Sequence, residues 1–269
     1  MKPRVINENP GWTFVVPDSV ADWDGPSHWE RERLASMQAN LHPGEVLFDI
    51  GVEHGWLSTV YGSFVGHENM VLVEPSPEMW PDIRKTWAAN QFPDPLYAFV
   101  GFAGAHNIDD PKVAMRSVKG KRSVKFAWPE CARLEGPESG PMAYRIMGKH
   151  TEVPVTTVDR IVELTGIIPN ALTIDVEGAE WEVLRGAHDT LVTHRPKLWV
   201  SVHPDLMEKD FNPRPDGEPF LIEEFFGWVE SHSYKRVYLG TDHEQHHVFW
   251  PIEQLANYVP LGHVEGSKS

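Results

Sequence analysis

Two short apolar runs in the first third of the chain each end in acidic residues. The first run, residues 46–50, leads into a turn with the pattern D-x-G-x-x-x-G, and the second ends in Val-Glu-Pro. Loops that bind the pyrophosphate of a dinucleotide read G-x-G-x-x-G and present bare backbone amides to the anion. Carboxylates stand where those phosphates would lie, so this turn is expected to repel pyrophosphate and to attract a cation. The residues expected to contact such a ligand are Asp49, Gly51, Glu53, Gly55, Glu74 and Pro75.

The order of apolar run, glycine turn, helix and second apolar run predicts the first βαβ unit of a nucleotide-binding fold. In such folds the acid that ends the second strand accepts hydrogen bonds from ribose hydroxyls, a role assigned here to Glu74. A ligand with a ribose, an ammonium and a sulfonium fits both acidic positions, and S-adenosylmethionine is that ligand. Gly101 and Phe102, after the third strand, are expected to contact the adenine. An α/β domain that binds another nucleotide remains the alternative on these two motifs.

A third segment points to a family. Residues 171–187 read ALTIDVEGAEWEVLRGA, and a further apolar run, residues 197–202, ends in His203. Together with the first turn and the Val-Glu-Pro segment, this resembles the FkbM family of S-adenosylmethionine-dependent methyltransferases, over roughly residues 29–250. The chain departs from the family pattern at Val52-Glu53-His54, and at Ser201, where family members often have a glutamate. The resemblance implies a Rossmann-like class I methyltransferase fold.

Three residues at the ends of the later strands have side chains suited to methyl transfer. The reaction is an in-line displacement, and a hydroxyl acceptor must also lose a proton. His203 is the candidate base, because imidazole titrates near neutral pH; the alternative is a histidine that only caps the turn at Pro204. Asp175, Glu177 and Glu180 are expected to position the acceptor or the cofactor, with Asp175 also next to the methyl donor. Alternatively, the acids only stabilise the N-terminus of the following helix.

Two groups of residues raise the question of a metal ion. Asp175, Glu177 and His203 form a set of carboxylate and imidazole ligands that suits Mn²⁺ or Zn²⁺ at least as well as Mg²⁺. A divalent metal is not favoured, and the reaction is expected to proceed without one. The segment His243–His247 is rich in histidine but lacks a recognised ligand spacing. It is expected to be a solvated loop, with His246 or His247 lining the acceptor pocket as the alternative.

These side chains require an α/β scaffold: a seven-stranded, mostly parallel sheet with a reversed last strand. Strands are predicted at residues 46–50, 71–74, 96–100, 171–175, 197–202, 235–239 and 247–250. Helices are predicted at residues 27–37, 56–64, 78–90, 180–191 and 220–232, the first of them capped by Ser27 with Glu30. The predicted organisation is an N-terminal extension with a helix (1–44), a methyltransferase domain (45–260) and a flexible tail (261–269).

Residues 111–156 depart from strict alternation of strand and helix, and predict a β-hairpin insertion at the carboxyl edge of the sheet. One hairpin is expected to join 113–118 to 123–128, and a second strand pair to join 143–147 to 152–156. Six basic residues and no acid lie between Pro111 and Pro129. This charge fits either a solvated edge hairpin or a lid over an anionic acceptor.

The composition excludes several kinds of partner. The formal net charge of −15 disfavours nucleic acid and anionic membrane surfaces, which usually bind basic proteins. The single cysteine, Cys131, excludes an internal disulfide and fits a reducing cytoplasm. The first residues lack the apolar core of a signal peptide, and no apolar run approaches the length of a membrane helix. The Asp/Asn-Pro-Pro-aromatic and Pro-Cys motifs of nucleic-acid methyltransferases are also absent.

The sequence therefore predicts a cytoplasmic S-adenosylmethionine-dependent enzyme that O-methylates a hydroxyl of a sugar, a glycoconjugate or another small molecule. The alternatives are N-methylation of a small amine and a nucleotide-binding module without catalysis. The sequence makes no prediction of the oligomeric state.

Overall fold

The computed structural model describes residues 1–6, 8–18, 29–107, 128, 145–146, 149–150, 154–207 and 221–261. Its centre is a seven-stranded sheet with the order β12-β13-β11-β10-β3-β4-β5. The strands are β3 (Leu47–Ile50), β4 (Met70–Glu74), β5 (Tyr97–Val100), β10 (Ala171–Ile174), β11 (Lys197–Val202), β12 (Tyr234–Thr241) and β13 (Gln245–Pro251). All pairings are parallel except those of β13 with β11 and with β12. The predicted mostly parallel sheet with a reversed last strand is confirmed.

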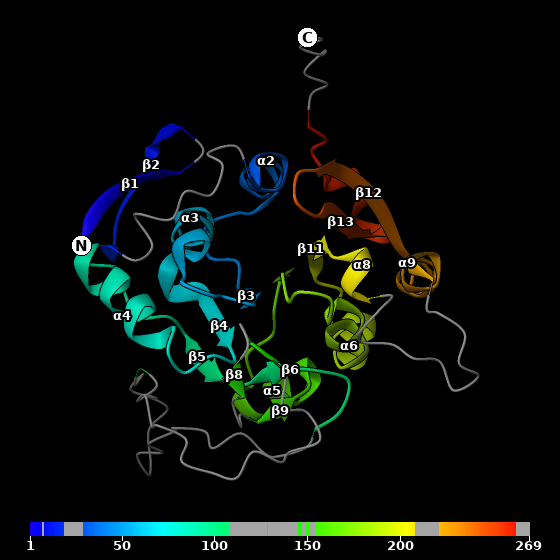
Figure 1. Cartoon of the computed structure of the whole chain (residues 1–269). Coiled ribbons are helices and arrows are strands. Elements are labelled where there is room, and N and C mark those ends of the chain that lie inside the picture. Colours follow the sequence, from blue (N-terminus) through cyan, green and yellow to red (C-terminus); the bar gives the residue numbers. More distant parts are fainter. Residues whose placement is uncertain are drawn as a thin grey trace.

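Helices cover both faces of this sheet (Figure 1). One face carries α2 (Arg31–Asn40), α3 (Trp56–Val65) and α4 (Trp80–Ala89), and the other carries α5 (Val158–Thr165), α6 (Glu180–Arg185), α7 (His188–Thr193) and α9 (Ile222–Ser231). Successive residues of a strand point to opposite faces, and in β4 Met70 and Leu72 join one core cluster while Val71 and Val73 join the other. Both faces are therefore buried, which explains why these strands read as continuous apolar runs.

The helix that begins at Trp56 packs on the sheet as its apolar spacing predicts. Trp56, Val60, Tyr61 and Phe64 are buried in the first core cluster, and Leu57 packs against it. Among the described residues no helix is long and apolar enough to cross a lipid bilayer.

The N-terminal region contains an antiparallel hairpin that the sequence analysis missed. Strands β1 (Lys2–Ile6) and β2 (Asn9–Val16) pair with each other, and β2 packs on α3 and α4. Phe14 and Val16 belong to the same core cluster as α3, while the side chain of Asn90 donates to the Val15 carbonyl and accepts from its amide. Residues before 44 thus contribute to the main core.

Two helix boundaries differ from the prediction. Ser27, the predicted cap, lies outside the described residues. The helix α2 begins at Arg31. Glu30, which precedes it, has a left-handed backbone with φ 63°, and its side chain makes no capping hydrogen bond. The helix expected over 180–191 is two helices, because the Asp159 carboxylate accepts the Asp189 and Thr190 amides and gives α7 its own N-terminus. Gly186 lies in this break, where a Cβ atom would overlap the carbonyl oxygen of Gly104.

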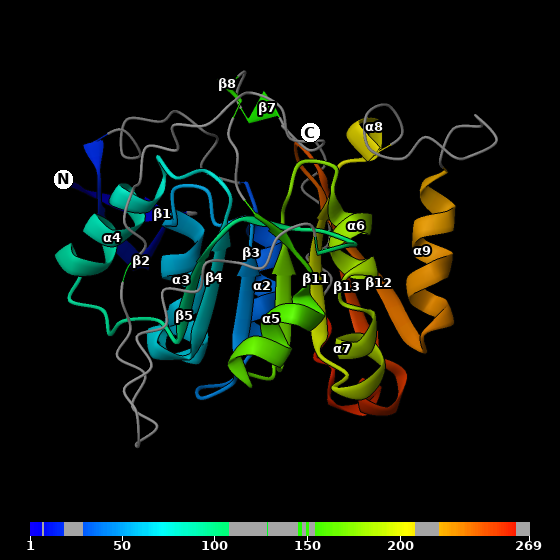
Figure 2. The ribbon, with the colours of Figure 1, turned by 90° about the horizontal axis from the view of Figure 1, so that it is seen from below.

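The predicted insertion lies mostly outside the described residues. So do the predicted strand 113–118, the predicted strand 123–128 apart from Trp128, and the tail from residue 262 onward. Strands β7 (Arg145–Ile146) and β8 (Lys149–His150) form an antiparallel pair beyond the carboxyl ends of the parallel strands (Figure 2). The prediction that 152–156 pairs with 143–147 is wrong, because β9 (Val155–Thr156) pairs in parallel with β6 (Phe102–Ala103). The carbonyl of Pro154, which precedes β9, accepts a hydrogen bond from the Phe102 amide and so holds β9 beside β6.

Candidate functional site

The site lies at the edge where β3, β4, β10 and β11 end, because the carboxyl ends of parallel strands meet at one side of a sheet. Gly51 follows β3 with φ 91°, and a Cβ atom there would overlap the carbonyl oxygen of Asp175 at the end of β10. Only glycine allows this left-handed conformation together with so close a backbone approach. The first turn is therefore held directly against Asp175.

Glu74 fastens this turn to the end of β4. Its carboxylate accepts the amide of Glu53 at 2.8 Å and the amide of Ser76 at 2.7 Å. Burial, only partly offset by these hydrogen bonds, raises the pKa of Glu74 to about 7. Glu53 and Glu74, two of the acids predicted to contact the ligand, thus lie next to each other.

Asp49 lies beneath the turn rather than on its surface. Its side chain is buried and accepts a hydrogen bond from the hydroxyl of Ser58 in α3 at 2.5 Å. Burial raises the pKa of Asp49 to about 7. The expectation that Asp49 presents its carboxylate at the turn surface is corrected: in this arrangement Asp49 fixes the turn to α3.

The remaining residues predicted to bind the cofactor border Glu74. Gly55 has φ 75° and precedes the first turn of α3, and Pro75 directly follows Glu74. The Gly101 amide donates to the Glu74 carbonyl, and half-buried Phe102 follows it. The structure therefore gathers the predicted cofactor residues around the ends of β3, β4 and β5.

His203 follows β11 and is held between two buried carboxylates. Its Nδ1 lies 2.7 Å from Glu180 Oε1, and its Nε2 lies 2.6 Å from Glu244 Oε2. The Nε2 atom also lies 4.0 Å from Asp175 and 3.7 Å from Glu177. The three residues predicted to act in catalysis are thus brought together, and Glu180 and Glu244 join them.

These carboxylates change the acid–base character of His203. Burial alone would lower the pKa of the imidazole, but the hydrogen bonds with Glu180 and Glu244 outweigh it and raise the pKa to about 11. At neutral pH the ring is an imidazolium that donates from both nitrogens. In this arrangement His203 has no free lone pair with which to act as the predicted base.

The carboxylates around His203 differ in access to solvent. The side chain of Glu177 is 78% exposed, whereas those of Glu180 and Glu244 are buried. Desolvation raises the pKa of Glu177, although the His203 imidazolium acts in the opposite direction. Desolvation is also the largest cause that raises the pKa of Glu244 to about 7, and the negative charge of Asp175 is the second. Glu177 is the carboxylate that an incoming molecule reaches first.

A buried arginine joins α2 to the carboxyl edge. Arg33 Nη1 donates to Ser201 Oγ at 2.7 Å and to Asp175 Oδ2 at 3.2 Å, and Nη2 donates to Thr173 Oγ1. The same Nη1 donates to Glu30 Oε2 at 2.8 Å. Ser201, one of the positions where the chain departs from the family pattern, thus accepts a hydrogen bond from the Arg33 guanidinium.

The segment His243–His247 is not the solvated loop expected from its sequence. Glu244, His246 and His247 are buried, and His246 and His247 lie within β13. His246 Nε2 lies 3.0 Å from Asp242 Oδ1, which is also 2.9 Å from His243 Nδ1. Residues 246–251 are buried without interruption, and the apolar run Val248-Phe249-Trp250 is the signal that could have placed the preceding histidines in a strand; no ligand spacing marks them.

Three sets of described side chains bring ligand atoms within 4.8 Å of one another, a separation that a metal ion can bridge. One is the predicted set of Asp175, Glu177 and His203. The others are Glu30 with Glu244 and His246, and Asp242 with His243 and Glu244. Glu30, Arg33, Asp242, Glu244 and His246 were not among the predicted catalytic or cofactor-binding residues.

The fold and site define a class I S-adenosylmethionine-dependent methyltransferase. Residues 49–236 match the model of the methyltransferase FkbM domain. The chain belongs to this FkbM methyltransferase family, as its sequence motifs predict.

Solved structures of low sequence identity resemble the chain. A methyltransferase FkbM from Methylobacillus flagellatus KT is 15% identical with a TM-score of 0.43, over 77% of this chain and 44% of that one. A precorrin-6y C5,15-methyltransferase from Geobacter metallireducens GS-15 is 10% identical with a TM-score of 0.45, over 88% and 94%. Aeropyrum pernix fibrillarin, solved with natively bound S-adenosyl-L-methionine, is 10% identical with a TM-score of 0.41, over 81% and 73%. No curated protein sequence matches the chain.

Proposed function

We propose that the protein transfers a methyl group from S-adenosylmethionine to a hydroxyl of a sugar, a glycoconjugate or another small molecule. The observation that carries this proposal is the exposed carboxylate of Glu177, 3.7 Å from His203 Nε2 and next to the turn that Glu74 holds. A proton acceptor is what a hydroxyl needs when it is methylated.

The side chains of the turn fit the cofactor in charge and in hydrogen-bonding capacity. Glu53, Asp175 and Glu177 are close enough for their charges to affect one another, and Glu74 lies beside Glu53. Their carboxylates suit an ammonium group, a sulfonium and a ribose diol. Bound S-adenosylmethionine supplies the electrophilic methyl group, and Glu53, Glu74, Gly101 and Phe102 are the residues proposed to hold it.

Glu177 is proposed to take the proton of the acceptor hydroxyl. Of the carboxylates around His203 it is the exposed one, and its raised pKa makes it a better base than an ordinary glutamate. The His203 imidazolium is proposed to orient the acceptor oxygen through a hydrogen bond from Nε2, once that nitrogen turns from Glu244. In this proposal His203 positions the acceptor, and Glu177 takes the role of base that was predicted for His203. The proposed reaction needs no metal ion bound by Asp175, Glu177 and His203.

The described site favours a neutral acceptor. Carboxylates outnumber the arginines near this edge, where Arg33 contacts Asp175 and Arg4 lies near Glu53. A phosphorylated acceptor would therefore be repelled unless basic residues from elsewhere reached it. The six basic residues between Pro111 and Pro129 all lie outside the described residues. A small amine is the second candidate acceptor, since the same carboxylates attract an ammonium group. We further propose a cytoplasmic enzyme without nucleic-acid or membrane partners.

Calorimetric titration with S-adenosylhomocysteine, after removal of any bound cofactor, tests the first half of this proposal. Micromolar binding is expected. Methyl transfer from isotope-labelled cofactor to panels of sugars, hydroxylated metabolites and amines tests the second half, with the product bond identified by NMR. A labelled N-methyl product would replace the O-methylation proposal, and a wild-type protein that does not bind S-adenosylhomocysteine would overturn both halves.

A further inference from the structure

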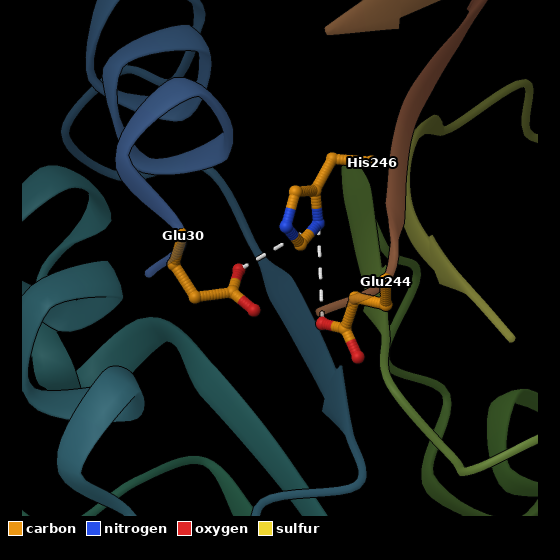
Figure 3. A group of neighbouring side chains, drawn as sticks. All are labelled: Glu30, Glu244 and His246. Atoms are coloured by element: carbon orange, nitrogen blue, oxygen red, sulfur yellow. Dashed lines mark ion pairs between the residues drawn. The ribbon is translucent and has the colours of Figure 1, made fainter. Parts of the chain in front are cut away.

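Glu30, Glu244 and His246 form a buried cluster next to His203, whose Nε2 lies 2.6 Å from Glu244 Oε2. Glu30 precedes α2, whereas Glu244 and His246 lie at the start of the last strand of the sheet (Figure 3). Their exposed fractions are 2%, 4% and 0%. Two acidic side chains so deeply buried next to each other repel unless a proton or a cation lies between them.

The ligand atoms of this cluster converge on one point. His246 Nδ1 lies 3.9 Å from Glu30 Oε2 and 4.0 Å from Glu244 Oε1, and the three side chains face one another in Figure 3. Atoms that bind one transition-metal ion at about 2.1 Å lie roughly 3 to 4 Å apart. The hydroxyl of Ser201, 3.3 Å from His246 Nδ1, is a fourth polar atom at the same place.

A second observation also indicates a ligand at this point. Glu244 Oε1 is buried and accepts no hydrogen bond from an N–H or O–H donor among the residues that the structure describes, although Oε2 of the same carboxylate faces His203. The Glu244 carboxylate instead lies against that of Glu30, which is itself an acceptor. A buried oxygen left without a donor is costly, and a cation is one way to satisfy it.

The surrounding residues orient the ligands as metal-binding sites require. The Nε2 atom of His246 faces Asp242 Oδ1 at 3.0 Å, so a hydrogen bond to this carboxylate directs the lone pair of Nδ1 toward Glu30, Glu244 and the Ser201 hydroxyl, which a cation would displace as its hydrogen-bond partner. Arg33 Nη1 donates to Glu30 Oε2 and so fixes the second ligand. Asp242 Oδ2 in turn accepts the Glu30 amide at 2.7 Å, which joins the two segments that supply the ligands.

We propose that Glu30, Glu244 and His246 bind a divalent transition-metal ion, for which Mn²⁺ and Zn²⁺ are the best matches. One imidazole with two carboxylates suits these ions better than Mg²⁺ or Ca²⁺, which prefer oxygen ligands alone. Since its ligands are buried, this ion holds α2 against β13 and does not touch the acceptor. The proposal does not depend on which acceptor is methylated.

Titration of chelator-treated, dialysed protein with MnCl₂, followed by calorimetry and by electron paramagnetic resonance, tests the proposal. One tightly bound ion per chain is expected, with a magnetic coupling to an imidazole nitrogen. Glu30→Gln and His246→Gln are expected to weaken binding at least about tenfold, and His246→Gln to remove the nitrogen coupling. Glu177→Gln is the matched control, and it is expected to retain both the ion and the coupling.

Two results would overturn the proposal. One is the absence of binding of Mn²⁺ and Zn²⁺ to wild-type protein at millimolar concentrations, which needs no variant to fold. The other is binding that Glu177→Gln or His203→Gln abolishes while Glu30→Gln leaves it unchanged, which would place the ion at Asp175, Glu177 and His203. Circular dichroism and thermal melting of each variant verify that it is folded. Added Mn²⁺ is expected to raise the melting temperature of the wild type and of Glu177→Gln by several degrees, and that of His246→Gln by less.

Discussion

Two buried acids and one histidine at this site have pKa values well above those of the free side chains. Burial raises the pKa of Asp49 and of Glu74 to about 7, while carboxylate partners outweigh the effect of burial and raise that of His203 to about 11. Near neutral pH the acids are therefore half-protonated and the histidine is charged. Changes in these protonation states are expected to be visible in binding and in rate.

Binding of S-adenosylhomocysteine is expected to depend on the ionisation of Glu74. As the pH falls from 8 to 6 through its pKa of about 7, Glu74 is protonated and accepts the ribose hydroxyls less well, so the affinity falls. Glu74→Gln is expected to weaken binding at pH 8 by about 10- to 100-fold, the worth of a hydrogen bond to a charged group, and to reduce the pH dependence. Calorimetry at each pH measures both effects, with exposed Glu78→Gln as the control. Wild-type affinity that is constant between pH 6 and 8 would contradict this role.

Replacing Glu177 by glutamine is expected to reduce kcat by roughly 10²- to 10⁴-fold, because the acceptor proton then has no base. The affinity for S-adenosylhomocysteine should change little. In the wild type, kcat should rise with pH through the raised pKa of Glu177 and then level off. Steady-state kinetics measure this, and Glu182→Gln, on the same segment, is the control. Full activity in Glu177→Gln would refute this assignment and favour a different base.

At the scale of elements, the contact between the first turn and the end of β10 sets the geometry of the site. Gly51 and Gly44 have nearly the same left-handed backbone, at φ 91° and 89°, but a Cβ atom meets the Asp175 carbonyl at Gly51 and no atom within 4 Å at Gly44. Alanine substitutions at Gly44 and Gly51 therefore distinguish the cost of a left-handed backbone alone from that cost combined with steric overlap.

Gly44→Ala is expected to lower the free energy of unfolding by about 1–2 kcal/mol, the cost of a left-handed alanine. Gly51→Ala should cost more, since β3 and β10 must also move apart, and it should weaken the binding of S-adenosylhomocysteine. Urea denaturation and calorimetry measure the two effects. Equal stability losses in the two variants would show that the turn tolerates a Cβ atom.

The sequence could predict elements whose apolar runs are long and continuous, and it placed β11 at residues 197–202 as observed. It could not predict the β1–β2 hairpin, because Pro3, Pro10 and Gly11 interrupt the pattern and packing on α3 and α4 stabilises the strands instead. The residues of the site likewise fall into those that the sequence could locate and those that it could not. Asp175, Glu177 and His203 follow strands and could be located, whereas Glu30 and Glu244 meet only through tertiary structure, and no spacing in the chain marks them.

At the scale of the whole molecule, hydrogen bonds of Asn90 attach the N-terminal hairpin to the end of α4, in addition to the apolar packing of β2 on α3 and α4. The Asn90 side chain bonds the Val15 amide at 2.8 Å and the Val15 carbonyl at 2.7 Å. Asn90→Ala is expected to reduce the free energy of unfolding by about 1–3 kcal/mol, because buried backbone groups of β2 lose their partner. Asn69→Ala, which removes a single bond to the nearby Val65 carbonyl, is the matched control and should cost less.

Hydrogen exchange gives a separate measure of this coupling. The amides of residues 2–16 should lose protection in Asn90→Ala while those of β3 and β4 keep theirs, because the hairpin can open without the sheet. If these amides exchange freely in the wild type, the hairpin is not part of the stable core.

The order of strands also bears on how the protein is made. Of the described strands, β13 is the last to leave the ribosome, yet it lies between β11 and β12, both of which are synthesised earlier. A nascent chain that ends before residue 245 must leave a gap beside β11, with unpaired backbone groups that could pair with another chain. His203 also lacks Glu244 until then. We therefore expect nascent chains to depend on chaperone protection until β13 closes the sheet.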